Sequence, residues 1–242
     1  MTEFDGRTIL VTGAAGGIGG AIVRHLVAAG ADVVASHRTP GGLEPIVAET
    51  GCRALPFDLT SEDEIAAALG DLDLWGVVNC GGFGGEIATP METDISVFDN
   101  AMAINARGTL LVTKYAARTL IRLGVGGAIV NVSSQASLVA LSNHVSYAAS
   151  KAAVDSITRV SALELGQYGI RVNSVHPTVV MTEMSEFYWG RPEIGGPFLE
   201  QMPLGRWATQ DDVAGPVVFL LSDAASMISG AHLPIDGGYT CR

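Results

Sequence analysis

Two side chains four residues apart, Tyr147 and Lys151, could carry acid–base chemistry in this chain. On a helix, residues with this spacing lie on the same face. A positively charged ammonium group favours the ionised form of a neighbouring phenol, so the pair could exchange a proton with a ligand. The apolar run 128–133 just upstream predicts a buried strand, and Ser134 adds a hydroxyl group at its carboxyl end. These residues indicate an active site only if the chain also binds a cofactor.

A glycine-rich segment near the start of the chain predicts that cofactor site. It follows a β-branched apolar run at 8–12 and opens a helical pattern, with the spacing Gly-x-x-x-Gly-x-Gly. Glycine allows a tight turn and lets backbone N–H groups approach a pyrophosphate at the N-terminus of a helix. A flexible turn is the alternative, but the strand and helix on either side favour a nucleotide-binding loop. The loop residues expected at the cofactor are Gly13, Gly17, Ile18 and Gly19.

The end of the second expected strand, 32–36, bears on which nicotinamide cofactor is bound. An NAD-binding chain usually offers a carboxylate to the ribose hydroxyls about 20 residues after the glycine loop. This chain has His37 and Arg38 there. An arginine can bind a phosphate group with two hydrogen bonds. NADP(H) is therefore favoured over NAD(H), although Arg38 could also be a solvated side chain at a strand end.

Two further loops are expected at the same edge of the sheet. Asp58 and Leu59 follow the third strand, and Asp58 could contact the adenine or help to start the next helix, for which Ser61 and Glu64 predict a capping box. A second glycine-rich loop, with Asn79 and Gly81, follows the fourth strand. In doubly wound sheets, ligands bind at the carboxyl ends of the strands.

Two long helices are expected in the second half of the chain. The range 92–123 predicts one that carries Asn105, and asparagine inside a helix either faces solvent or serves a specific contact. The other helix carries Tyr147 and Lys151, reaches about Tyr168, and ends before Gly169.

The segment 182–206 differs in composition from the rest of the chain, because aromatic residues alternate with glycine and proline. This mixture predicts a mobile, aromatic-lined flap over a pocket rather than a regular core element. A helix from Thr209 to Leu221 and a last strand follow. Strands and helices alternate without a linker, which predicts one domain over 1–242: a Rossmann-type, doubly wound parallel sheet with helices on both faces. Its seven strands are expected at 8–12, 32–36, 52–57, 72–78, 128–133, 170–176 and 232–236.

Composition narrows the possible partners. The 242 residues carry a formal net charge of −11, which disfavours nucleic acid, an anionic membrane or an acidic carrier protein as partner. No signal peptide or membrane span is read from the sequence. The three cysteines lack the spacing of metal ligands, and we expect reduced thiols, a cytoplasmic location and no metal.

The chain resembles the short-chain dehydrogenase/reductase family along its whole length. The family marks are Thr12-Gly13-x-x-x-Gly17-x-Gly19, Asn79, Asn105, Ser134, Tyr147 and Lys151, in order. The resemblance implies hydride transfer between a nicotinamide and a carbonyl carbon. It implies Tyr147 as the acid/base, Ser134 as a hydrogen-bond donor to the carbonyl oxygen, and Asn105 as support for a water chain from Lys151. It adds Pro177, Val180 and Thr182 to the expected cofactor residues, together with Tyr147 and Lys151 themselves.

From residue 127 onward the chain is similar to a tetrameric carbonyl-reductase subgroup of that family, most clearly in Gly127–Gln135, Asn143-His144 and Pro177–Thr182. This similarity implies NADPH-linked reduction of small ketones, α-dicarbonyls or ketoses by a homotetramer. The substrate-binding residues that it implies are Ser134, Gln135, Leu141, His144, Tyr147 and Trp189. Gln135 and His144 could instead be surface and packing residues of their loop.

Three other functions share these motifs. One is an NAD(H)-linked polyol or secondary alcohol dehydrogenase, with His37 tolerating an unphosphorylated ribose. Another is a 3-oxoacyl-carrier reductase, which the acidic charge disfavours. The last is a cofactor-binding protein without turnover, which the intact set of catalytic residue types disfavours.

Overall fold

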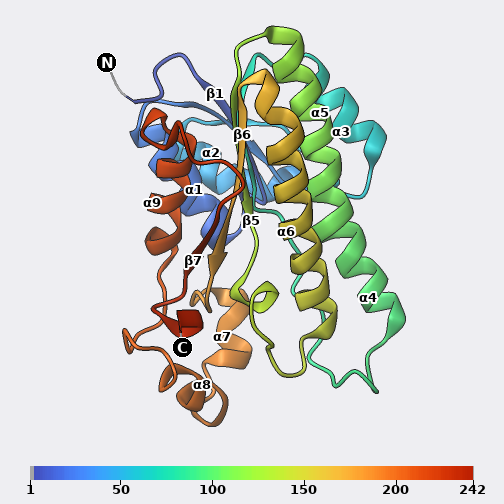
Figure 1. Ribbon diagram of the computed structural model, residues 1–242, viewed down its shortest axis with the longest axis vertical. Helices are drawn as coiled ribbons and strands as arrows, with labels where there is room; N and C mark the ends of the chain where they lie inside the picture. The colour runs from blue at the N-terminus through green and yellow to red at the C-terminus, as the bar shows by residue number, and fades with distance from the viewer. Residues whose placement is uncertain (1–2, 242) are drawn as a thin grey trace.

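A parallel sheet of seven strands forms the centre of the protein, in the order β3-β2-β1-β4-β5-β6-β7 (Figure 1). The computed structural model describes residues 3–241, without the side chains of Glu183 and Met184. The expected doubly wound fold is confirmed. The strands are β1 (Thr8–Thr12), β2 (Asp32–Ser36), β3 (Arg53–Ala54), β4 (Leu74–Asn79), β5 (Gly127–Val132), β6 (Ile170–Pro177) and β7 (His232–Ile235).

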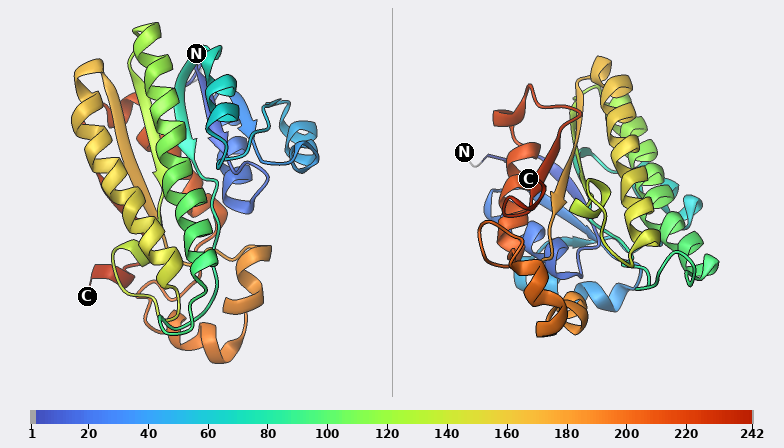
Figure 2. Two further views of the ribbon diagram at one scale, coloured as in Figure 1. Left: turned by 90° about the vertical axis from the view of Figure 1, so that its right-hand side faces the viewer. Right: turned by 60° about the horizontal axis from the view of Figure 1, so that its bottom comes forward.

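Helices cover both faces of this sheet. One layer holds α1 (Gly17–Ala28), α2 (Glu44–Thr50) and α9 (Gln210–Leu221), and α1 packs closely on α9. The other layer holds α3 (Glu62–Gly70), α4 (Ile95–Ala101), α5 (Gly108–Leu123) and α6 (Val145–Leu165) (Figures 1 and 2). Each layer closes its own apolar core over the sheet, because the strands of a parallel sheet are apolar on both faces.

The strand order reverses next to β1, which pairs with β2 on one side and β4 on the other. At such a point the loops after neighbouring strands leave in opposite directions, and a crevice opens at their carboxyl ends. The loops after β1 and β4 are the two glycine-rich loops. The fold therefore places both of them at the usual ligand site of this architecture.

Three expected elements differ from the observed ones. The third strand was expected over 52–57 but is only Arg53–Ala54, because the chain leaves the edge of the sheet at Pro56, which has no N–H to donate. The helix expected over 92–123 is interrupted by a π-helix, Met102–Arg107, between α4 and α5. The capping box at α3 is half formed: the Ser61 hydroxyl accepts the Glu64 N–H, but the Glu64 carboxylate accepts the N–H of Asp58 instead.

The segment 182–206, expected as an irregular flap, contains two short helices, α7 (Glu183–Trp189) and α8 (Pro192–Leu199). They lie beyond the carboxyl ends of the strands, at the bottom of Figure 1. A bridge between Val180 and Ala208 joins the two ends of the segment. We call 182–206 the flap below; its mobility stays a prediction. Within residues 3–241, every helix is too short or too polar to cross a membrane.

Candidate active site

The first glycine loop packs so tightly that three of its expected positions exclude side chains. Gly13 has a φ of +68°, and a Cβ there would lie 2.6 Å from the Cα of Gly81. A Cβ on Gly19 would collide with the Gly13 carbonyl oxygen, and one on Gly17 would lie 2.9 Å from the Thr182 side chain. The loop thus ends directly at the N-terminus of α1, next to the start of the flap.

The N-terminus of α1 has the features of an anion site. The N-cap residue Gly16 makes no side-chain cap, and the first turn carries no acidic residue. A hollow of about 180 Å³ adjoins loop residues Ala14 and Gly17. Uncapped N–H groups and the helix dipole favour a phosphate there. These residues fit the pyrophosphate of a dinucleotide.

Thr12 connects the two glycine loops, a role that the sequence motif alone did not reveal. Its hydroxyl oxygen accepts the backbone N–H groups of Cys80 and Gly81, both at 3.1 Å. Asn79 lies deeper: its amide donates to the Asn131 side chain at 2.8 Å, inside the sheet. Burial raises the pKa of the Cys80 thiol to about 11, so this thiol stays protonated near neutral pH.

The end of β2 presents a cation with no competing partner. Within residues 3–241, no hydrogen bond or ion pair holds the exposed Arg38 guanidinium. His37 turns back on its own loop, where Nδ1 lies 3.1 Å from the Thr39 hydroxyl. The Asp58 carboxylate accepts the N–H and O–H of Thr60, and these bonds, followed by the charge of Arg38, hold the pKa of Asp58 below its usual value. These bonds fit the helix-start role that was the alternative assignment of Asp58, and its contact with the adenine stays a prediction; Leu59 packs against Gly81.

The expected catalytic residues come from three elements. Ser134 lies two residues beyond the end of β5, Tyr147 and Lys151 lie in the first two turns of α6, and Asn105 lies in the π-helix. The Lys151 ammonium group is buried, donates to the Val132 carbonyl oxygen at 2.8 Å, and lies 5.7 Å from the centre of the Tyr147 ring. The helical spacing read from the sequence thus does place phenol and ammonium side by side.

The Asn105 side chain makes specific buried contacts and does not face solvent, which were the two possibilities left open by the sequence. It is 1% exposed, and its side chain accepts the Phe83 N–H at 2.7 Å and donates to the Phe83 carbonyl oxygen at 2.8 Å. It also donates to the Ser150 hydroxyl at 2.9 Å. Ser150, which sequence reasoning missed, bonds in turn to the Tyr147 carbonyl oxygen. Asn105 therefore ties the second glycine loop to the helix of Tyr147 and Lys151.

Ser134 has its hydroxyl proton available. Its oxygen accepts the N–H of Ala136 at 3.1 Å, and the residue is 7% exposed. A hydroxyl group has one proton and two acceptor positions. The Ser134 O–H can therefore donate to a ligand oxygen.

His144 and Trp189 lie together, as the substrate assignment requires. Their rings stack with centroids 5.9 Å apart, and Tyr188 contacts His144 edge-on. His144 Nδ1 lies 2.6 Å from the Ser142 carbonyl oxygen, so Nδ1 carries the proton of the neutral ring and Nε2 is an acceptor. Beyond Trp189 the aromatic contacts continue through Phe198 to Trp207 and Tyr239, two residues whose role the sequence did not signal.

Gln135 and Leu141 complete the expected substrate residues. Gln135 is 3% exposed, and within the described residues its Oε1 atom has no hydrogen-bond donor. A buried acceptor without a partner is costly, and a ligand hydroxyl would satisfy it. Leu141 is half-buried in the loop before α6.

Three of the expected cofactor residues lie against the core. Pro177, at the end of β6, and Val180 are buried, and Ile18 packs on the core.

Comparison with known proteins agrees with this geometry. Residues 13–240 match the family model described as enoyl-(acyl carrier protein) reductase. The chain belongs to the short-chain dehydrogenase/reductase family and is an oxidoreductase, in a family that binds nicotinamide cofactors.

Two curated relatives and two solved structures give a finer view. The chain is 42% identical to L-xylulose reductase of Caenorhabditis elegans, over 98% of this chain and 97% of that protein. It is 40% identical to D-threitol dehydrogenase of Mycolicibacterium smegmatis, over 99% and 95%. A short-chain dehydrogenase/reductase from Mycobacterium ulcerans superposes with a TM-score of 0.96 at 36% identity, over 99% of this chain and 92% of that one. A putative 2-deoxy-D-gluconate 3-dehydrogenase from Agrobacterium tumefaciens with bound NADP gives 0.91 at 33%, over 98% of both chains.

Proposed function

We propose that this protein reduces a small ketose or related ketone, L-xylulose being the model substrate, by hydride transfer from NADPH. The observation that carries the proposal is the presence of Ser134, Tyr147, Lys151 and Asn105 around the carboxyl ends of the strands, with Lys151 beside Tyr147 and two glycine loops that fit a dinucleotide. The near-full-length similarity to L-xylulose reductase supports the choice of substrate.

In this proposal each protein group has one task. The bound nicotinamide supplies the hydride. Ser134 donates its free O–H to the substrate oxygen and holds it near Tyr147, which delivers the proton as general acid. The buried Lys151 ammonium group stabilises the phenolate that Tyr147 leaves behind. Asn105 holds the second glycine loop against α6 and supports a water chain that returns a proton from solvent.

The cofactor preference rests on Arg38. An unpartnered guanidinium beside the expected ribose position can bind a 2′-phosphate bidentately. The bound NADP of the Agrobacterium structure is in line with this choice. The proposed cofactor residues are those of the two glycine loops, the end of β2, and the stretch from Pro177 to Thr182. Asp58 and Leu59 after β3, and Tyr147 and Lys151 on α6, complete the set.

The substrate residues favour a ligand with several hydroxyl groups. His144 Nε2 and Gln135 Oε1 are both acceptors without a protein donor in the described part of the chain. Two acceptors suit the O–H groups of a polyhydroxy ketone. Trp189 and Leu141 would cover its carbon chain.

A second candidate function is supported by the similarity to D-threitol dehydrogenase. It is the oxidation of a polyol or secondary alcohol, with the same residues and with Tyr147 acting as base. A polyol also offers hydroxyl groups to His144 Nε2 and Gln135 Oε1. The proposed substrate residues therefore do not discriminate between ketone reduction and alcohol oxidation.

For the whole protein we propose a cytoplasmic homotetramer. Four large apolar side chains are exposed on the adjacent outer faces of α5 and α6: Leu110, Ile121, Val160 and Leu163, with Leu163 at 83%. An exposed apolar face of this kind usually marks a protein contact. We propose a second copy of this chain as the partner that covers this face, in line with the tetrameric subgroup that the sequence resembles.

The decisive experiment is a steady-state screen of purified protein with L-xylulose, erythrulose, a small diketone, threitol and xylitol, using NADPH/NADP⁺ and NADH/NAD⁺ in parallel. We expect the highest kcat/KM for a ketose with NADPH. A higher value for a polyol with NAD⁺ would favour the second candidate, and no turnover in any combination would refute both.

A further inference from the structure

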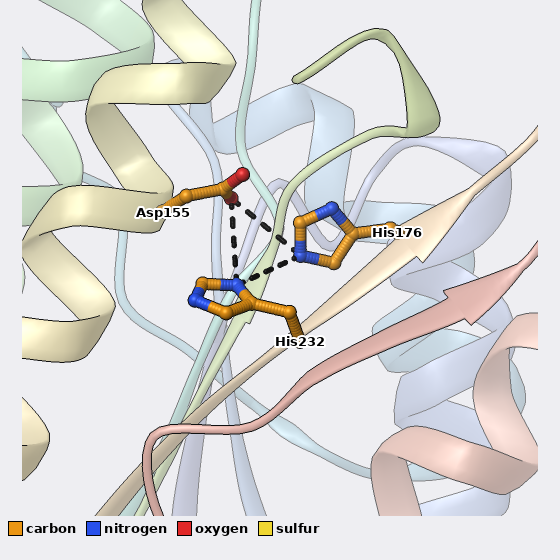
Figure 3. Close-up of side chains that lie close together, drawn as sticks. All are labelled: Asp155, His176 and His232. Carbon is orange, nitrogen blue, oxygen red and sulfur yellow. Dashed lines mark hydrogen bonds and ion pairs between the residues drawn. The ribbon is translucent and has the colours of Figure 1, made fainter. Parts of the chain in front are cut away.

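A buried group of polar side chains lies behind the end of β5 and is not used by the proposed mechanism. It consists of Asp155 on α6, His176 on β6 and His232 on β7 (Figure 3). His176 is 0% exposed and Asp155 is 4% exposed. His176 Nε2 lies 3.1 Å from His232 Nδ1 and 3.5 Å from Asp155 Oδ1. His232 is half-buried, and burying the other two groups costs free energy unless they are bonded to one another or to a ligand.

The spacing of the three atoms alone would suit a metal ion such as zinc, which takes histidine and carboxylate ligands at about 2.0–2.2 Å. The surrounding donors argue against one. His232 Nε2 lies 3.2 Å from the Arg159 guanidinium, which can only donate. The His232 Nε2 atom is therefore the acceptor, and the proton of the neutral ring lies on Nδ1. A metal would need the lone pair of Nδ1.

The protonation of His176 can be assigned in the same way. Its Nδ1 lies 3.2 Å from the carbonyl oxygen of Ser134, which can only accept. Ser137 is also within 3.1 Å of this nitrogen, but its hydroxyl proton goes to the same carbonyl at 2.6 Å. His176 Nδ1 must therefore carry a proton, and in a neutral ring Nε2 is an acceptor.

Ser174 connects the two rings. Its hydroxyl oxygen lies 2.7 Å from His232 Nδ1 and 2.9 Å from His176 Nε2, so it accepts from the first and donates to the second. The bonds then run in one direction, from Arg159 through His232, Ser174 and His176 to the Ser134 carbonyl. Bonds aligned in this way strengthen one another.

Burial, more than the neighbouring charges, favours the neutral form of both rings. Burial lowers the pKa of His176 and of His232, against the opposing effect of Asp155. Arg159 faces His232, and the Lys151 ammonium group acts in the same direction on His176. Asp155 itself accepts the Ser133 hydroxyl at 2.6 Å, which holds the residue before Ser134 against α6.

We propose that His176 is a positioning residue for Ser134: it fixes the backbone carbonyl of Ser134 through Nδ1–H, and the bonds from Arg159, His232 and Ser174 select the ring tautomer that makes this possible. The inference rests on the proposed function, because it assigns the purpose of holding Ser134 to hydride transfer. Ser134 must point its O–H at a substrate oxygen, and a displacement of a fraction of an ångström there reduces the rate.

Two substitutions of His176 separate positioning from mere packing. In His176→Leu the donor to Ser134 is lost, and we expect kcat for the best carbonyl substrate to fall about tenfold or more while the Kd for NADPH stays unchanged. In His176→Asn the side-chain amide can place an N–H near the position of Nδ1, so most of kcat should return. If both variants keep wild-type kcat, or if both lose the same kcat in proportion to a fall in Tm, the proposal is wrong.

Ser174→Ala provides a variant that keeps His176 in case the leucine variant does not fold. It removes one of the two donors to His176 Nε2 and leaves His232 Nδ1 at 3.1 Å, so kcat should fall by a smaller factor than in His176→Leu. A wild-type kcat in a folded Ser174→Ala would contradict the chain of bonds.

The tautomers can be measured without turnover, by ¹⁵N NMR of the five histidines. At pH 7 we expect His176 and His232 each to carry one proton, on Nδ1, with or without substrate. A proton on Nε2 of either ring, or bound zinc at one equivalent that is lost in His232→Asn, would overturn the proposal in favour of another network or a metal site. Failure of the proposed function would look different: the tautomers would be as stated, but wild-type protein would reduce no carbonyl compound.

Discussion

The proposed cofactor preference depends on a single residue, Arg38. The only described group on which its charge is seen to act is the Asp58 carboxylate, whose own hydrogen bonds go to Thr60. The guanidinium is therefore free to bind an anion, and the position where a carboxylate would repel the phosphate holds His37.

Replacing Arg38 with aspartate should reverse this preference. The Kd for NADPH should rise about tenfold or more, since one charge-assisted bond contributes roughly 1.5–3 kcal/mol, while the Kd for NADH should change little or improve. Fluorescence titration of both cofactors measures this, with Arg38→Lys as the control that keeps the charge and loses the bidentate geometry. Equal effects on the two cofactors would show that Arg38 does not contact the phosphate.

At the level of elements, the π-helix is one feature that the sequence did not predict. The spacing of apolar residues predicted a helix over 92–123. The wider turn of a π-helix changes this spacing too little for the sequence to distinguish it from an α-helix. The structure shows its purpose: the widened turn brings Asn105 inward, where it bonds to Phe83 and Ser150.

Asn105→Ala should therefore affect both stability and activity. It leaves part-buried backbone groups of Phe83 unpaired, and we expect a loss of about 1–3 kcal/mol in the free energy of unfolding, together with a lower kcat. Chemical denaturation and steady-state kinetics give the two values. The exposed Asn100 on α4 offers the matched control, because Asn100→Ala should change neither. An Asn105→Ala protein as stable and active as wild type would refute this role.

Sequence patterns predicted the elements whose apolar periodicity and turn residues both indicate the same structure. The sheet, the glycine loops and the Tyr147–Lys151 pair follow from β-branched runs, glycine and helical spacing. The flap helices α7 and α8 were missed because they are held by contacts among Trp189, Phe198 and Trp207. These residues are about nine positions apart, so their contacts leave no short-range periodicity in the sequence. The same limit applies to His176 and His232, which come together only when β6 and β7 pair.

At the scale of the whole molecule, α5 and α6 lie side by side (Figure 2). Their exposed apolar side chains are those that the proposed tetramer would bury. A glutamate at Leu163 would bury a charge in such an interface. We therefore expect Leu163→Glu to reduce the mass measured by light scattering from four 25.1 kDa chains to a smaller species. Met91→Glu, at a position 93% exposed outside these faces, should keep the wild-type mass. A wild-type mass for both variants would exclude this face as an interface.

The most direct test of the account compares wild type and Tyr147→Phe for NADPH oxidation with L-xylulose. The variant keeps the ring and loses only the O–H that delivers the proton. We predict that kcat falls at least about 100-fold, the usual contribution of a general acid, while the Kd for NADPH stays at the wild-type value. A Tyr147→Phe protein that turns over within a few-fold of wild type would contradict the central claim.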